Sequence, residues 1–146
     1  MMEIREGKKE DFPRVGMLLE ECHKEAVEVF GLKYSKELVQ LAMEEHYKQA
    51  IVLVADGEVV GVIAGKIVNY PLQNGLMFQE MIWYVTKKYR TYGVKLLRAL
   101  EAKCKAEGIQ ILIMVAGGAT MKKKLDQLYK IMGYQELETH YIKVIE

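Results

Sequence analysis

Apolar and polar positions alternate with a helical period over the first third of the chain. Residues 4–6 are expected to form a short strand, and residues 15–29 carry apolar side chains at helical spacing. Asp11 is placed to cap this first helix. Ser35 is placed to cap a second helix, which is expected to reach about Tyr47.

The period changes to that of strands at residue 50. Residues 51–55 form an apolar, mostly β-branched run, and Asp56-Gly57 after it is a strong signal for a two-residue hairpin turn. Further strands are expected over residues 59–68 and 76–85. The two glycines inside the second of these three strands indicate a bulge or a close backbone neighbour.

The last third mixes helices and strands. A helix is expected from Gly93 to about Gly108, and residues 109–115 predict a strand that is buried on both faces. Thr120 is placed to cap a last helix, and residues 134–145 are expected to close the chain as one or two strands. This order predicts an α/β fold of the α+β type, with helices on both faces of a mixed, mostly antiparallel sheet.

Composition restricts the class of protein. The length of 146 residues and the absence of any linker-like segment predict a single domain over residues 1–146. A net charge of +1, from 21 basic and 20 acidic residues, argues against nucleic-acid binding. No apolar run approaches the ~20 residues that span a membrane, and the start of the chain lacks the apolar stretch of a signal peptide. With only Cys22 and Cys104, a reduced, cytoplasmic protein without a metal site is expected.

The segment of residues 85–97 is the most informative for function. A strand ends there, a short basic loop with a glycine follows, and an amphipathic helix begins. Backbone amides at a helix start lie at the positive end of the helix dipole and suit an anion such as a pyrophosphate. Lys87, Lys88, Arg90 and Lys95 add positive charge, although many strand–loop–helix units bind nothing.

Two motifs carry a resemblance to a known family. The sequence R-T-Y-G-V-K, from Arg90 to Lys95, resembles motif A of the GNAT acetyltransferase superfamily, usually written [QR]-x-x-G-x-[GA]. Downstream, L-Y-K-I-M-G-Y over residues 128–134 is similar to a second signature of that family. The expected order of strands and helices agrees with the GNAT fold from residue 3 to the end.

The resemblance implies acetyl-CoA as co-substrate and a position for it. The fourth and fifth strands would diverge, and the backbone of Tyr84 and Val85 would pair with the pantetheine amides. Tyr129 would place its phenol near the thioester sulfur as a general acid, or it would be a packed structural tyrosine. The pyrophosphate would be held by the backbone amides of Arg90, Thr91, Tyr92, Gly93, Val94 and Lys95.

Two departures from the family pattern concern cofactor binding. Lys95 replaces the small last residue of motif A, and the asparagine common before the last helix is missing, its place falling near Lys122. They keep open an alternative function, in which a GNAT-fold domain that is weak or inactive in catalysis binds acyl-CoA or a protein partner.

The acceptor amine needs a route for its proton. An amine with a pKa of ~10.4 is neutral in only about one molecule in a few thousand at pH 7, so a base would help. Glu80 is the candidate because it lies mid-strand among apolar residues, where desolvation raises the pKa of a carboxyl. The alternative is a solvent-facing or lysine-paired glutamate.

The expected reaction is therefore acetyl transfer by direct attack on the thioester. The acceptor is an unidentified small-molecule or protein amine, and edge strands at the C-terminus favour a homodimer.

Overall fold

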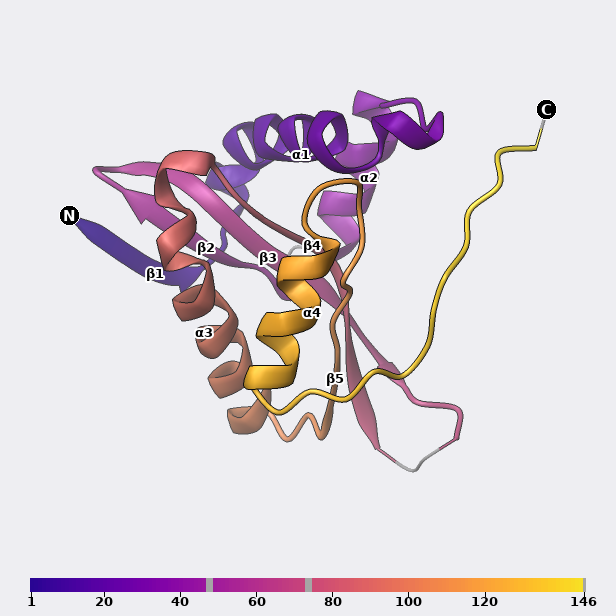
Figure 1. The fold of residues 1–146 in the computed structure, drawn as a ribbon. Coiled ribbons are helices and arrows are strands. Elements are labelled where there is room, and N and C mark those ends of the chain that lie inside the picture. The colour runs from indigo at the N-terminus through magenta and orange to yellow at the C-terminus, as the bar shows by residue number, and fades with distance from the viewer. Residues whose placement is uncertain (47–48, 73–74, 146) are drawn as a thin grey trace. The chain divides into compact units, whose positions relative to one another are not determined.

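The computed structural model describes residues 1–46, 49–72 and 75–145 (Figure 1). The chain divides into two compact units, one formed by Met1–Leu19 with Ser35–Met114 and the other by Glu20–Tyr34 with Val115–Glu146. The first unit contains the whole sheet.

The sheet has five strands in the order in which they occur along the chain. Its first four strands pair antiparallel, and the fifth pairs parallel with the fourth. This mixed, mostly antiparallel sheet confirms the predicted fold class. The strands are β1 (Met2–Glu6), β2 (Ile51–Ala55), β3 (Glu58–Asn69), β4 (Leu76–Val85) and β5 (Ile111–Ile113). The helices are α1 (Phe12–Ala26), α2 (Lys36–His46), α3 (Gly93–Ala106) and α4 (Lys122–Ile131).

Helices cover both faces of the sheet in the first unit. Val15 and Leu18 of α1 and Met43 of α2 pack in one buried cluster with alternate residues of β2 and β3, such as Val52 and Val62. On the other face α3 packs against β2, β3 and β4, with its stripe of leucines buried. Covering both faces explains why every residue of β2 is buried.

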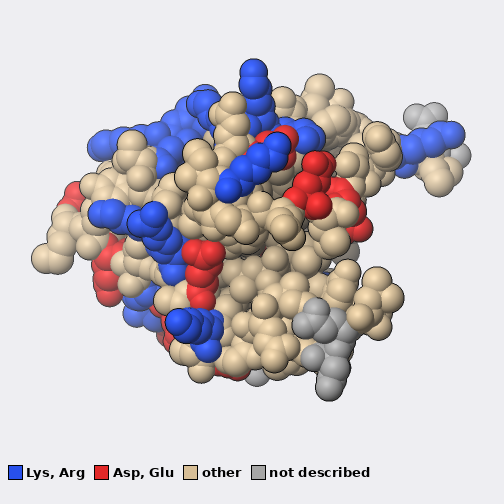
Figure 2. Space-filling model, turned by 60° about the horizontal axis from the view of Figure 1, so that its bottom comes forward, with Lys and Arg blue, Asp and Glu red and all other residues tan. Residues whose placement is uncertain are grey.

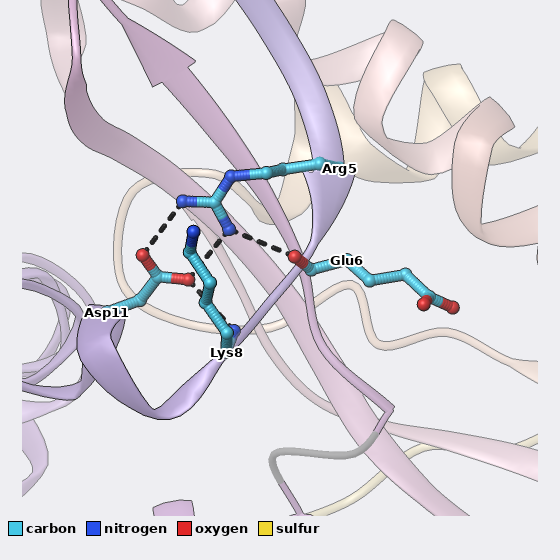
Figure 3. A network of polar contacts seen from close by, with 4 residues as sticks. All are labelled: Arg5, Glu6, Lys8 and Asp11. Carbon is cyan, nitrogen blue, oxygen red and sulfur yellow. Dashed lines mark hydrogen bonds and ion pairs between the residues drawn. The ribbon is translucent and has the colours of Figure 1, made fainter.

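The start of the chain is tied to α1 by a charged network (Figure 3). Asp11, for which a cap of α1 was predicted, directly precedes that helix at the end of the 3₁₀ turn η1 (Lys9–Asp11). Its buried carboxylate accepts two hydrogen bonds from Arg5 on β1, at 2.8 and 2.9 Å, and a third from the backbone amide of Lys8 at 2.9 Å. A bidentate, charge-assisted pair of this kind holds β1 against the helix start.

Several predicted turn and cap positions are confirmed. Asp56 and Gly57 both have positive φ, at 49° and 82°, as a tight hairpin turn requires. The hydroxyl of Ser35 accepts a hydrogen bond from the amide of Leu38 at 3.3 Å, which is the expected cap of α2. The predicted end of that helix near Tyr47 lies outside the described residues.

Three predictions about the last third of the chain are wrong. β5 is only three residues long and half-buried, so it is not a strand buried on both faces. Thr120 does not cap α4, because Met121 occupies the N-cap position and makes no side-chain cap bond. The loop before α4 is held instead by the amide of Ala119, which donates to the carbonyl of Ala26 at 2.8 Å.

The C-terminal segment is the third correction. Residues 134–145 contain no strand, although strands were predicted there. A strand forms only where its backbone groups find a partner edge, and none of the strand pairs in the described part of the chain includes this segment. The apolar side chains from Leu137 onward are consequently exposed, Tyr141 by 94% and Ile145 by 87%.

Candidate active site

β4 and β5 pair only over a short stretch. The parallel pairs join Met77, Phe78 and Gln79 to the three residues of β5. β4 continues beyond Gln79 to Val85 and stays paired with β3. The stretch Glu80 to Val85 therefore lies outside the ladder with β5, and it contains the predicted site residues Tyr84 and Val85.

A bulge in β4 changes the direction of the side chains at this point. Ala64 and Gly65 are consecutive on β3, but their partners on β4 are Ile82 and Glu80, so Met81 is an extra residue. Side chains alternate across a strand, and one extra residue reverses the alternation. Glu80 consequently lies on the same face of the sheet as Trp83, whereas simple alternation would have placed it with Ile82.

Glu80 is buried, with 9% of its surface exposed. Its neighbour across the bulge is Gly65, where a Cβ atom would lie 2.1 Å from the carbonyl oxygen of Gln79. The two strands thus approach too closely here for any side chain at position 65. Burial rules out the alternative of a solvent-facing glutamate, and it is the environment that the proposed base requires.

A tight basic turn connects β4 to α3. The turn is the 3₁₀ helix η4 (Lys87–Tyr92), which begins with a hydrogen bond of 2.9 Å from the amide of Tyr89 to the carbonyl of Thr86. α3 then starts at Gly93, whose amide donates to the carbonyl of Arg90. The amide of Gly93, one of the six that were expected to hold the pyrophosphate, therefore already donates a hydrogen bond within the turn.

The charged side chains of the turn behave in two ways. Lys87, Lys88 and Lys95 are exposed, and the ammonium groups of the latter two lie over the rings of Tyr89 and Tyr92 at 5.3 and 5.4 Å. Among all the lysine and arginine side chains of the molecule, many gather along the upper edge of the face drawn in Figure 2.

Arg90 is half-buried instead. Its Nε donates a 2.9 Å hydrogen bond to the carbonyl of Val85, and its guanidinium lies over the ring of Tyr84, 5.5 Å from the centroid.

Gly93 stands at the start of α3 with helical backbone angles, φ −58° and ψ −41°. A Cβ atom built there would meet only the Cζ2 atom of Trp83, at an ordinary contact distance of 3.7 Å. Thr91 is exposed, and Tyr92 and Val94 are half-buried around it. The fold of the first unit thus gives no steric reason for a glycine at position 93.

Tyr129 belongs to α4 in the second unit. Its hydroxyl donates a 3.0 Å hydrogen bond to the carbonyl of Val115, and its ring lies 5.3 Å from that of Tyr134. Only 7% of the residue is exposed. These contacts describe a packed tyrosine whose phenol proton is engaged by a backbone oxygen.

Lys122, near the place expected for the family asparagine, pairs with Asp126 at 2.9 Å. This hydrogen bond raises the pKa of the Lys122 ammonium.

One feature of the site was predicted from the sequence and another was not. The glycines of β3 indicated a bulge or a close backbone neighbour, and both are confirmed, since Gly65 is the close-approach position and lies beside the bulge at Met81. The bond from Arg90 to Val85 had no signal, because a side chain that contacts a backbone carbonyl leaves no periodic pattern.

Among residues 1–46, 49–72 and 75–145, no group of three or more histidine, cysteine, aspartate or glutamate side chains is arranged to hold a metal ion. No helix in that part of the chain has the length and apolar character needed to cross a bilayer.

Comparison with known proteins assigns the chain to a family. A sequence model described as "Acetyltransferase (GNAT) family" matches residues 9–134. The chain belongs to this family. Among curated proteins, no sequence matches this acetyltransferase-family chain significantly.

Solved structures with the same fold are numerous. A ribosomal-protein-alanine N-acetyltransferase from Brucella melitensis biovar Abortus 2308 superposes with a TM-score of 0.75 at 16% identity, covering 99% of both chains. An aminoglycoside acetyltransferase from an uncultured soil metagenomic sample gives 0.73 at 17% identity, covering 100% of this chain and 99% of the other. Glucosamine-6-phosphate N-acetyltransferase from Arabidopsis thaliana gives 0.72 at 17% identity, with the same coverage. At these identities the likeness shows the fold alone.

Proposed function

We propose that this protein transfers an acetyl group from acetyl-CoA to an amine. The observation that carries the proposal is the course of β4, which leaves its ladder with β5 after Gln79 and runs directly into the basic turn and the start of α3. An extended ligand with amide groups at one end and phosphates at the other fits this sequence of backbone edge, turn and helix start.

In this proposal each part of the co-substrate has a partner in the first unit. The pantetheine amides pair with the backbone of Tyr84 and Val85. The pyrophosphate lies at the junction of η4 and α3, along residues 90–95. Lys87 and Lys95 are exposed beside this junction and add the positive charge that phosphates require.

The chemical step is a direct transfer. The nitrogen lone pair of the neutral amine attacks the thioester carbonyl, a C–N bond forms, and the C–S bond breaks with its electrons leaving on sulfur. Backbone amides of β4 near the bulge at Met81 polarise the carbonyl oxygen. Positioning of the two reactants supplies much of the rate.

Glu80 is the proposed base for the amine proton. Keeping a lysine-like amine neutral at pH 7 costs about 4.6 kcal/mol, which a nearby carboxylate offsets by accepting the proton directly or through water. The bulge supports this role because it puts the buried Glu80 on the same face of the sheet as Trp83. Trp83 is the side chain next to Gly93, at the helix start where the pyrophosphate is proposed to lie.

Tyr129 is the proposed acid that returns a proton to the leaving thiolate. In the structure its hydroxyl donates to Val115, so the O–H bond must rotate away from that carbonyl before it can serve sulfur. Because this rotation breaks an observed hydrogen bond, Tyr129 is the more informative of the two residues to mutate.

The similar solved structures do not indicate one acceptor amine. The three solved structures named above are described as acting on a ribosomal protein's alanine, an aminoglycoside and glucosamine-6-phosphate. We therefore propose a small-molecule or protein amine without choosing between them. A cytoplasmic location and a homodimer stay predictions from the sequence.

Two assays on the purified protein test the proposal. Acetyl-CoA should raise the melting temperature, and a panel of polyamines, aminoglycosides and peptide N-termini should contain an acceptor that releases free CoA thiol. Glu80→Gln, which keeps the side chain's shape, should lose most of that release while retaining the stabilisation by acetyl-CoA. Stabilisation without release for any amine would favour the alternative of an acyl-CoA-binding module. The absence of stabilisation would contradict both.

A further inference from the structure

Arg90 lies in the turn between β4 and α3, the two elements that are proposed to bind acetyl-CoA. Its side chain reaches back to the last residue of β4, where Nε donates to the carbonyl of Val85 at 2.9 Å. Its own carbonyl accepts the amide of Gly93, the first residue of α3. One residue thus connects the end of the strand to the start of the helix.

The guanidinium is also held from the side. It lies 5.5 Å from the ring centroid of Tyr84, which itself packs against the buried cluster beneath α1 and α2. An arginine plane on an aromatic face, with Nε bonded to a carbonyl, has a fixed direction that a lysine in its place would not reproduce. The exposed Lys87 in the same turn has the charge without this anchoring.

A backbone hydrogen bond fixes the end of β4, so the Arg90 side chain joins the start of α3 to a rigid point. The amide of Thr86 donates to the carbonyl of Val60 on β3 at 3.0 Å, so the end of β4 is fixed to the sheet. The separation between the backbone of Val85 and the first turn of α3 then depends on η4 and on the Arg90 side chain that spans it. In the proposed complex the same separation must match the distance between pantetheine and pyrophosphate.

We propose that Arg90 is a positioning residue for acetyl-CoA, which sets the spacing between β4 and α3 through its bond to Val85 and contributes little through its charge. This inference rests on the proposed function, because it concerns the same co-substrate. It differs from the usual expectation for an arginine beside a phosphate, which is a direct ionic contact.

Three variants separate geometry from charge. Arg90→Lys keeps the charge and removes the planar Nε donor, Arg90→Gln keeps a planar N–H donor and removes the charge, and Lys87→Gln removes an exposed charge from the same turn. For each, the Kd of acetyl-CoA is measured by calorimetry at several salt concentrations, since ionic contacts weaken with salt and a geometric effect does not.

The expected result is a roughly tenfold weaker Kd for Arg90→Lys with an unchanged salt dependence. Arg90→Gln should lose less affinity than Arg90→Lys and should also keep the salt dependence of the parent. Lys87→Gln should flatten the salt dependence with a small change in Kd. If Arg90→Lys binds as the parent does, or if Arg90→Gln flattens the salt dependence, the positioning role is wrong.

Hydrogen exchange of the ligand-free protein provides a second readout that does not depend on binding. The amides of residues 87–96 should exchange faster in Arg90→Lys than in the parent, while those of β2 should be unchanged. Equal exchange across 87–96 would overturn the inference even if affinity fell. Failure of the parent to bind acetyl-CoA would instead overturn the proposed function, so the two failures are distinguishable.

Discussion

Gly93→Ala gives the sharpest test of where the pyrophosphate lies. The backbone at Gly93 is already helical, and the new methyl group would meet only Trp83 at 3.7 Å. Alanine restricts the unfolded chain and favours a helix, so the variant should be more stable by about 0.5–1 kcal/mol. For a chain of this length that corresponds to a melting temperature higher by roughly 1–4 °C.

Binding should move in the opposite direction. If the phosphates approach the backbone at the start of α3, the added methyl group removes that approach, and we expect the Kd of acetyl-CoA to rise by about tenfold, or about 1.4 kcal/mol. Calorimetry on parent and variant measures this change directly. A variant that is both more stable and a poorer binder would show that the glycine serves the ligand and not the fold.

The matched control is Gly16→Ala. Gly16 lies within α1, and a Cβ atom there would meet only Met43 at 3.6 Å. The same stabilisation is expected, with no change in the Kd of acetyl-CoA. The reasoning would be refuted if Gly93→Ala bound acetyl-CoA as tightly as the parent, since the pyrophosphate would then lie elsewhere.

Three further predictions concern single side chains. Tyr129→Phe should lower kcat about 100-fold with little change in the KM for acetyl-CoA, and losing the bond to Val115 should cost about 1 kcal/mol of stability; a loss of stability alone would mean a structural tyrosine. Gly65→Ala should destabilise by about 3 kcal/mol by denaturant unfolding, because its Cβ would lie 2.1 Å from the carbonyl oxygen of Gln79; a neutral effect would contradict the close approach of β3 and β4. Burial raises the pKa of the Cys104 thiol to about 11, so Cys104 should resist alkylation at pH 8 until the protein unfolds, and rapid labelling of the native protein would refute this.

The Cys104 shift also has a consequence for stability at alkaline pH. The folded state holds the thiol proton up to about pH 11, whereas the unfolded chain releases it near pH 9. Below pH 9 the thiol is protonated in both states, and its contribution to the free energy of unfolding is fully present. As the pH rises toward 11 the unfolded chain loses the proton first, so the free energy of unfolding falls by up to about 2.7 kcal/mol. Cys104→Ala should remove this part of the decline, which unfolding in denaturant across pH 8–11 measures.

Much of the fold could be predicted because burial imposes a period on the sequence. β4 occupies the residues expected for it, and the Asp56-Gly57 turn follows from the need for positive φ. The exposed C-terminal segment could not be predicted. Its residues favour strands, but a strand also needs a partner edge, which local sequence does not reveal.

The candidate site was predictable in its position more than in its details. The location of Glu80 on a buried strand followed from its apolar neighbours, and burial is confirmed. The face on which Glu80 lies depends on one extra residue, Met81. It also depends on Gly65 of β3, whose lack of a side chain lets the two strands approach closely. Such a bulge depends on pairing between strands, so the alternation within β4 alone could not indicate it.

The central claim is that acetyl-CoA lies along the end of β4 and at the start of α3. Titration of the isotope-labelled protein with acetyl-CoA, followed through the backbone amide signals by NMR, tests it most directly. We predict saturable shifts concentrated at Tyr84, Val85 and residues 90–95, with the amides of β1 and β2 little affected. An absence of saturable shifts, or shifts confined to other parts of the chain, would contradict the account.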